Sequence, residues 1–237
     1  MSNMQKKIMK KFRNMINAIK AVKAPRTVAL RMPMLAVSGV LAGLFMTFPT
    51  YIGEVLQWLV YIPAAWVLFS LARDVDGARR VYLRAYRYGF FFFMAEYLVN
   101  YHWFFSFYPL DFTGMSRASA AVVVAVAWIG LSILASVAGG AVFLLFVAAA
   151  RGRAAKDAPV VLPFIGGALF ALFEWVETLG WMGVPWGRAA LGQLAFGNAV
   201  TVMSASMFGS YFVTFLIVSF SFLIADAACR PKRAAII

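Results

Sequence analysis

The sequence predicts an all-α polytopic membrane protein: a bundle of six transmembrane helices, preceded by an amphipathic helix and without a soluble domain. Composition is the first reason, because 63% of the 237 residues are hydrophobic, only 13% are charged and the mean hydropathy is +0.81. These values lie far outside the range of soluble domains. The second reason is a series of apolar runs long enough to cross a hydrocarbon core of about 30 Å. The runs are approximately Met34–Tyr51, Val55–Ala72, Tyr88–Tyr108, Ala118–Ala150, Val160–Leu179 and Ala199–Ala225.

The third reason is the distribution of positive charge, which also predicts the orientation. All but two of the 22 Lys and Arg residues lie before the first run or in every second gap after it, and only Arg117 and Arg188 lie in the other gaps. Under the positive-inside rule, both termini therefore face the cytoplasm and three connections face outward. Because the charges flank apolar runs and no aromatic-interleaved basic groove accompanies them, the net charge of +13 does not indicate nucleic-acid binding.

The first 33 residues form a separate basic segment. Ile8, Phe12 and Ile19 recur at helical spacing with lysines between them, so we expect an amphipathic helix on the anionic cytoplasmic leaflet. An unstructured basic tail is the alternative. After residues 1–33, the sequence predicts a six-helix transmembrane domain at residues 34–225 and a basic cytoplasmic tail at residues 226–237.

Two of the predicted spans carry small residues at four-residue spacing. Gly39 and Gly43 form one such pair in the first span, and Ser132, Ser136 and Gly140 form a series in the fourth. Small residues at this spacing allow a neighbouring helix to approach closely. The fourth span is also unusually long, since 33 residues would measure about 50 Å as one helix. We expect it to tilt or to project beyond the membrane.

Ionisable residues inside spans are costly and therefore informative. Glu96 in the third span shares a helical face with Asn100 and Trp103, at spacings of four and three residues. This pattern predicts a polar stripe that faces the bundle and rises toward the outer surface. Glu96 either hydrogen-bonds a neighbouring helix or contacts a ligand, and the spacing does not decide between these roles. Glu174 and Glu177 lie near the outer end of the fifth span.

The segment after the fifth span has the composition of a shaped interfacial loop. Glycine and proline interrupt the helix at residues 180–187, and Trp181 and Trp186 are expected at headgroup depth. The order Glu174, Gly-Val-Pro-Trp at 183–186 and Gln193 resembles the membrane domain of the bacterial apolipoprotein N-acyltransferases. In that family a Glu near the end of a helix precedes a Gly-Phe-Pro-Trp-like turn and a later Gln. Similar stretches are residues 46–49, 89–103, 112–114 and 209–217.

The resemblance covers about residues 34–225 and implies a bacterial inner-membrane protein whose partners are phospholipid and diacylglyceryl-lipoprotein. Two departures concern the outer loop: Glu177 stands where the family often has Arg, and Ala-Leu-Gly-Gln at 190–193 replaces the usual Gly-Tyr-Ser-Gln. We expect the lipid-facing entrance to be bordered by Glu96, Asn100, Trp103, Glu174, Trp181, Trp186 and Gln193. The alternative is that these residues only fix the loop and the aromatic belt.

Catalysis in that family resides in a nitrilase-like domain with a Glu-Lys-Cys triad, which follows a seventh helix. The present sequence ends at Ile237, so we expect a truncated or split version, not catalytic alone, with the nitrilase-like half lost or encoded separately. Cys229 and every lysine fall on the predicted cytoplasmic side, and His102 has no Gly-x-Ser-x-Gly elbow to serve. The sequence therefore predicts no catalytic residue, cofactor or metal site. A lipid- or partner-binding scaffold and a small transporter using Glu96 are the alternative functions.

Overall fold

The computed structural model describes residues 28–152, 155, 158–179, 183, 187–194 and 199–229. Within these residues the fold is helical and contains no strand. The predicted amphipathic segment up to residue 27, Trp181, Trp186 and most of the basic tail lie outside the described residues. The elements are α2 (Val28–Thr47), α3 (Tyr51–Gln57), α4 (Ile62–Ala72), α5 (Ala78–Asn100), η1 (Tyr101–Phe107), η2 (Asp111–Thr113), α6 (Arg117–Arg151), η3 (Pro159–Val161), α8 (Leu162–Val176), α9 (Ala189–Leu194), α10 (Ala199–Phe208) and α11 (Ser210–Cys229).

Five segments in the described part of the chain are long and apolar enough to cross a membrane, which supports the prediction of a membrane protein. They are Leu30–Thr47, Tyr51–Ala72, Arg117–Arg151, Pro159–Val176 and Ser210–Cys229. The third predicted run, Tyr88–Tyr108, corresponds to α5, which begins ten residues earlier than the run and is not among these five candidates. Its first half carries four arginines: Arg79, Arg80, Arg84 and Arg87.

Three of the predicted continuous spans are interrupted. The second divides into α3 and α4, and Pro63 occupies the first turn of α4. The sixth divides at Gly209, whose φ of 84° lies in the left-handed region that glycine adopts without strain. The third ends as an α-helix at Asn100 and continues as the 3₁₀-helix η1. Hydrophobic composition does not reveal these breaks, because the interrupting segments are themselves apolar.

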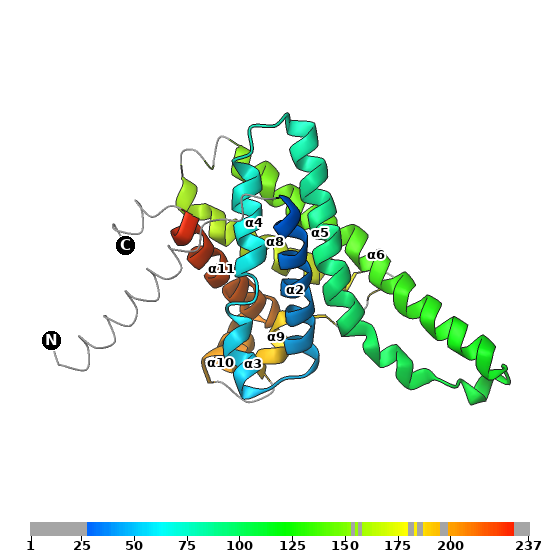
Figure 1. Ribbon diagram of the computed structural model, residues 1–237. Coiled ribbons are helices and arrows are strands. Elements are labelled where there is room, and N and C mark those ends of the chain that lie inside the picture. Colours follow the sequence, from blue (N-terminus) through cyan, green and yellow to red (C-terminus); the bar gives the residue numbers. More distant parts are fainter. Residues whose placement is uncertain are drawn as a thin grey trace.

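Helix α5 lies between α2 and α6 and makes the most extensive contacts of the bundle with these two helices (Figure 1). A Cβ atom on Gly39 or Gly43 would collide with the α5 backbone, at the carbonyl oxygens of Phe92 and Glu96 respectively. On the other side, Gly140 of α6 packs against the ring of Tyr86. The predicted close approaches at these glycines are confirmed, and they bring α2 against the α5 turn that carries Glu96.

Helix α6 is 35 residues long and is inclined to the other long helices (Figure 1). Its first half projects with η1 beyond the rest of the bundle, as the length of the run predicts. Ser116 begins the helix by accepting a hydrogen bond from the backbone N–H of Ser119. Within the helix, the buried hydroxyl groups of Ser132 and Ser136 donate to backbone carbonyls one turn earlier, so these polar groups are satisfied locally.

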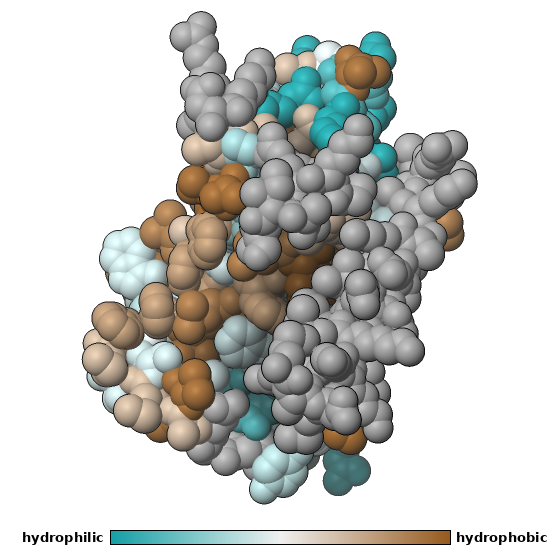
Figure 2. Space-filling model, turned by 90° about the vertical axis from the view of Figure 1, so that its left-hand side faces the viewer, coloured by the Kyte–Doolittle hydropathy of each residue, from teal (hydrophilic) through white to brown (hydrophobic). Residues whose placement is uncertain are grey.

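An aromatic core occupies the middle of the bundle and separates its two polar ends. Phe92 and Phe93 of α5 contact Phe143 of α6 and Phe170 of α8, with ring centroids 5.4–6.2 Å apart. Phe222 of α11 joins the same cluster. Figure 2 shows hydrophobic residues over the middle of one face, with hydrophilic residues gathered mainly at the top.

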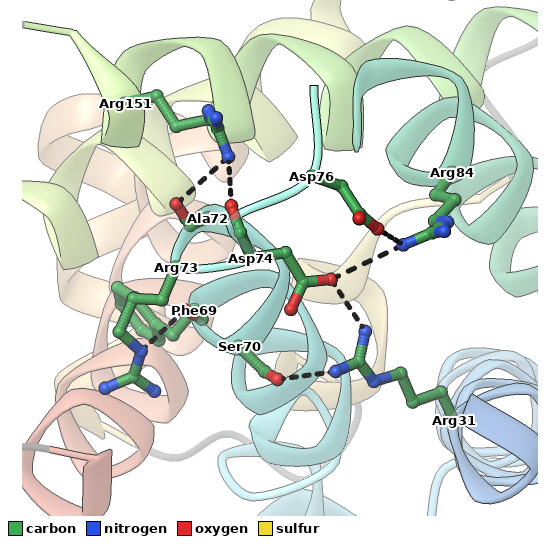
Figure 3. Close-up of polar contacts among 9 residues, drawn as sticks. All are labelled: Arg31, Phe69, Ser70, Ala72, Arg73, Asp74, Asp76, Arg84 and Arg151. Atoms are coloured by element: carbon green, nitrogen blue, oxygen red, sulfur yellow. Dashed lines mark hydrogen bonds and ion pairs between the residues drawn. The ribbon is translucent and has the colours of Figure 1, made fainter. Parts of the chain in front are cut away.

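The end of the bundle where α4 leads into α5 is called the arginine end, and two of its arginines form ion pairs with aspartates (Figure 3). Arg31 of α2 contacts Asp74 at 3.3 Å, and Arg84 of α5 contacts Asp76 at 2.6 Å. Arg151, the last residue of α6, donates to the backbone carbonyl of Asp74 at 2.9 Å. The α4–α5 connection thereby joins three helices.

Candidate functional site

The opposite end of the bundle collects acidic residues that sequence analysis places inside or near spans. Helix α5 runs from the arginine end to this one and carries Glu96 in its last turns. Helix α8 delivers Glu174 in its last turn and Glu177 as the residue that caps it. Arg188 directly precedes the short helix α9. Glu96, Glu174, Glu177 and Arg188 define what is called the carboxylate end.

Glu174 is buried, with only 6% of its surface exposed, and both of its oxygens have partners. Oε1 accepts a hydrogen bond of 2.9 Å from the backbone N–H of Ala189, and Oε2 accepts one of 2.7 Å from the Thr214 hydroxyl. One carboxylate therefore connects α8 to the start of α9 and to α11. A buried polar group with complete hydrogen bonding fixes geometry, because every alternative position leaves an unsatisfied donor or acceptor.

The other side of α9 is held by a second buried network. Gln193 donates from Nε2 to the Gln57 side-chain oxygen at 2.9 Å and to the Glu54 carbonyl at 2.6 Å, and its Oε1 accepts from the Trp58 indole at 2.9 Å. Gln57 in turn donates to the Ala189 carbonyl at 2.7 Å. Both Gln57 and Gln193 are completely buried. Helix α9 is thus fixed between α8 and α11 on one side and α3 on the other.

Glu177 and Arg188 each contact a tyrosine. The hydroxyl of Tyr97, a buried residue of α5, donates to the Glu177 carboxylate at 2.5 and 2.6 Å. Arg188 donates to the Ser210 hydroxyl at 3.2 Å, and its guanidinium carbon lies 4.7 Å above the centre of the Tyr211 ring. Within the described residues, Arg188 forms no direct salt bridge with any of the three glutamates of this end.

Glu96 and Asn100 lie together in the bundle interior, each with 3% of its surface exposed. Asn100 accepts a hydrogen bond from the Thr47 hydroxyl at 2.9 Å and contacts the Met46 sulfur at 3.7 Å, so it ties α5 to the end of α2. Glu96 differs, because its Oε2 atom has no hydrogen-bond partner among the described residues. An unsatisfied polar atom at this depth marks Glu96 as a functional candidate.

A groove of about 240 Å³ opens between α6 and α8 beside these residues. Its walls are apolar, and Glu177 and the hydroxyl-bearing Tyr101 supply its polar side chains. Phe173 and Val176 of α8 face Leu131 and other aliphatic residues of α6 across it. Because α6 and α8 both belong to candidate membrane spans, this groove is an apolar surface with a carboxylate, Glu177, among its lining residues.

The structure groups the sequence-predicted residues only in part. Glu96 and Asn100 share a buried face of α5, whereas Trp103 lies on η1, half-buried and stacked on Phe104 at 4.3 Å. The predicted three-residue stripe is therefore interrupted, because the change from α- to 3₁₀-helix alters the angle between successive side chains. Glu174 contacts the start of α9, and Gln193 belongs to α9 itself. Trp181 and Trp186 lie outside the described residues.

Sequence reasoning missed Gln57, Tyr97 and Thr214, each of which completes a buried hydrogen bond of the site. Gln57 carried a signal, since a glutamine within an apolar span needs an internal partner. Tyr97 and Thr214 carried none, because single hydroxyls are common in membrane helices and only the fold places them against a carboxylate. Among the described residues, no group of three or more His, Cys, Asp and Glu side chains is placed to hold a metal ion.

No protein-family model matches the chain, and no curated protein or solved structure matches it either. The chemistry of the carboxylate end therefore has to be judged from its own residues. Glu174 and Glu177 are held by neutral donors, and Glu177 lines an apolar groove.

Proposed function

We propose that the chain is the membrane domain of an apolipoprotein N-acyltransferase, which binds phospholipid and diacylglyceryl-lipoprotein at its carboxylate end. The proposal depends most on one observation: Glu174 and Gln193, which bracket the family-like turn, both hold α9. Glu174 attaches the start of α9 to α8 and α11, and Gln193 attaches the same helix to α3.

In this proposal the chain crosses the bacterial inner membrane six times, because α5 spans it in addition to the five candidate segments. Its packing between α2 and α6, both of which are candidate spans, supports this assignment. The four arginines of α5 lie in its first half, where they reach the cytoplasmic headgroups. Both termini then face the cytoplasm, and the carboxylate end lies at the outer surface.

The residues of the carboxylate end divide into two roles. Glu174 and Gln193 are positioning residues, since their polar atoms are occupied by hydrogen bonds within the protein. Glu177 and the α6–α8 groove form the substrate entrance, with the acyl chain between the helices and the polar part of the lipid at the carboxylate. Acyl transfer itself is assigned to a nitrilase-like partner domain with a Glu-Lys-Cys triad.

Lipoprotein acylation in cells tests this function. Mass spectrometry of mature lipoproteins is expected to show loss of the N-linked acyl chain when the gene is deleted, and recovery when the full chain is supplied in trans. Glu174→Ala should restore less acylation than the wild type at equal membrane abundance, because α9 loses its attachment to α8 and α11. Unchanged N-acylation in the deletion strain would exclude the proposal.

A second experiment separates the alternatives. Affinity purification from native membranes is expected to recover a protein with the Glu-Lys-Cys triad, whereas a purely structural scaffold would not require one. Among the described residues, transport is favoured only by the Glu96 Oε2 atom, which has no hydrogen-bond partner. Solute uptake by proteoliposomes that is abolished by Glu96→Gln, without a change in lipoprotein acylation, would replace the acyltransferase assignment with a transporter.

A further inference from the structure

Glu96 is a buried acid of α5 to which the proposed function assigns no role. Only 3% of its surface is exposed, and its Oε2 atom is buried without a hydrogen-bond partner among the described residues. Asn100, one turn further along the same helix, differs, because the Thr47 hydroxyl and the Met46 sulfur contact its side chain. Glu96 therefore has a buried oxygen for which the described part of the protein supplies no donor.

The acids around Glu96 surround it with charge of its own sign. Glu174 and Glu177 lie near enough to act on Glu96 electrostatically. The charge of Arg188 acts on these two glutamates. The remaining titratable neighbours of Glu96 are three tyrosines: Tyr61, Tyr97 and Tyr101.

The helices that pack on α5 bring no positive charge to the depth of Glu96. Helix α5 lies between α2 and α6 (Figure 1), whose ionisable side chains occur only near the helix ends, at Arg31, Arg117 and Arg151. No Lys or Arg among the described residues forms an ion pair with Glu96. A charge on this carboxyl group would therefore be uncompensated.

A proton is the ligand that this arrangement favours. An unpaired charge in an apolar interior costs more than a neutral polar group, and neighbouring like charges add repulsion. Protonation of the carboxylate removes both costs. A metal cation would need several ligands, whereas no group of three or more acidic, His or Cys side chains in the described part of the chain is placed to hold one.

We propose that Glu96 is a proton-binding site in the interior of the bundle, occupied while α5 is packed between α2 and α6. A proton from water adds to the carboxylate, and the neutral carboxyl group stays buried in the α5 turn against which Gly43 of α2 packs. Ionisation would place an uncompensated charge beside this close contact, so release of the proton should loosen the packing of α5. The site requires neither lipid nor acyl transfer and is therefore independent of the proposed function.

Infrared spectroscopy of the full chain in detergent at neutral pH tests the proposal, because protonated and ionised carboxyl groups absorb at different frequencies. Glu96→Gln, which keeps the size of the side chain, should remove the signal of one protonated carboxyl group per chain and leave the carboxylate signal unchanged. Asp76→Asn is the matched control: it removes an acid that pairs with Arg84 at 2.6 Å, so it should lower only the carboxylate signal. A lower carboxylate signal in Glu96→Gln would overturn the proposal.

The pH dependence of unfolding in detergent provides a second readout. Because the folded protein holds the proton and the unfolded chain releases it more readily, the contribution of the proton to stability is present at low pH and lost as the pH rises. The unfolding temperature of the wild type should therefore fall relative to that of Glu96→Gln as the pH is raised. A difference between the two proteins that stays constant with pH would contradict the proposal.

A third measurement needs no variant. A hydrophobic carbodiimide reacts with protonated carboxyl groups, so peptide mass spectrometry of the labelled wild type should find Glu96 among the modified residues. Labelling of Glu96 should be equally fast in sodium chloride and in choline chloride. An unmodified Glu96 would reject the site, and labelling that sodium alone suppresses would reject the proton as its occupant in favour of a metal cation.

Discussion

The two ends of the bundle hold their charges in opposite ways. At the arginine end, acids and bases pair directly: Asp74 contacts Arg31 at 3.3 Å and Arg84 at 3.8 Å, at the edge of the bundle (Figure 3). At the carboxylate end, Glu174 and Glu177 are held by hydroxyl groups and a backbone N–H, while Arg188 contacts Ser210 and Tyr211.

This difference separates anchoring from ligand binding. Ion pairs near water cost little to form and release, and they fix the connections between helices. Buried carboxylates with neutral donors cost more, and proteins retain them where a charge or proton has a use. The arginine end accordingly joins neighbouring helices, whereas the carboxylate end holds the buried carboxylates on which the proposed function depends.

The first prediction concerns the orientation of the two ends, and its effect is all-or-none. Val75 and Phe112 are both highly exposed, in the α4–α5 connection and in η2 respectively. In a Cys229→Ser background, Phe112→Cys should react with a membrane-impermeant maleimide in intact cells, and Val75→Cys should react only after permeabilisation. The reverse pattern would place the carboxylate end in the cytoplasm and end the proposed function.

The second prediction is a large loss of stability on Glu174→Ala. The substitution leaves the Ala189 N–H and the Thr214 hydroxyl without their acceptor, and each orphaned buried group costs about 1–3 kcal/mol. The free energy of unfolding in detergent should therefore fall by about 4 kcal/mol. Glu177→Ala, which removes a carboxylate with greater exposure, is the control and should cost less than half as much. Equal effects would mean that α9 is not held by Glu174.

The third prediction addresses the arginine end. Asp74→Ala leaves Arg31, whose side chain is 8% exposed, with only the Ser70 hydroxyl, whereas Arg84 keeps Asp76. We expect a loss of about 2 kcal/mol, below the range for a fully buried pair because Asp74 is itself 25% exposed. Asp76→Ala, at an exposed pair, should cost about 0.5 kcal/mol. A cost for Asp76→Ala that matched Asp74→Ala would contradict the distinction drawn from burial.

The sequence predicts the membrane class and the helical content because these depend on composition and run length. It also predicts the close packing at Gly39 and Gly43, since only small residues at that spacing allow it. The breaks at Pro63 and Gly209 were missed, although proline and glycine provide a local signal for both. The length of the apolar runs outweighs these two local signals, so the segments that contain Pro63 and Gly209 are predicted as continuous spans.

The candidate site is less predictable than the fold, because its contacts join residues that are distant in sequence. Glu96 and Glu174 were identified from the cost of burying charge. Their partners were not, since nothing near Thr214 in the sequence distinguishes its hydroxyl from others in the same span. Glu54 was missed for the opposite reason: it lies in a gap between apolar runs, where an acid looks solvated until the fold buries it.

The last prediction is the smallest and bears on the entrance to the α6–α8 groove. Tyr97→Phe keeps the ring that packs on Phe93 and Tyr101, and removes only the hydroxyl that donates to Glu177. Stability should fall by about 1 kcal/mol, the net contribution of one hydrogen bond. Glu177 should also react faster with a hydrophobic carbodiimide, because its carboxylate is no longer held against α5. Glu174, held by Ala189 and Thr214, should react at the wild-type rate. Faster modification of both glutamates would show instead that the Tyr97 hydroxyl stabilises the whole carboxylate end and does not act on Glu177 alone.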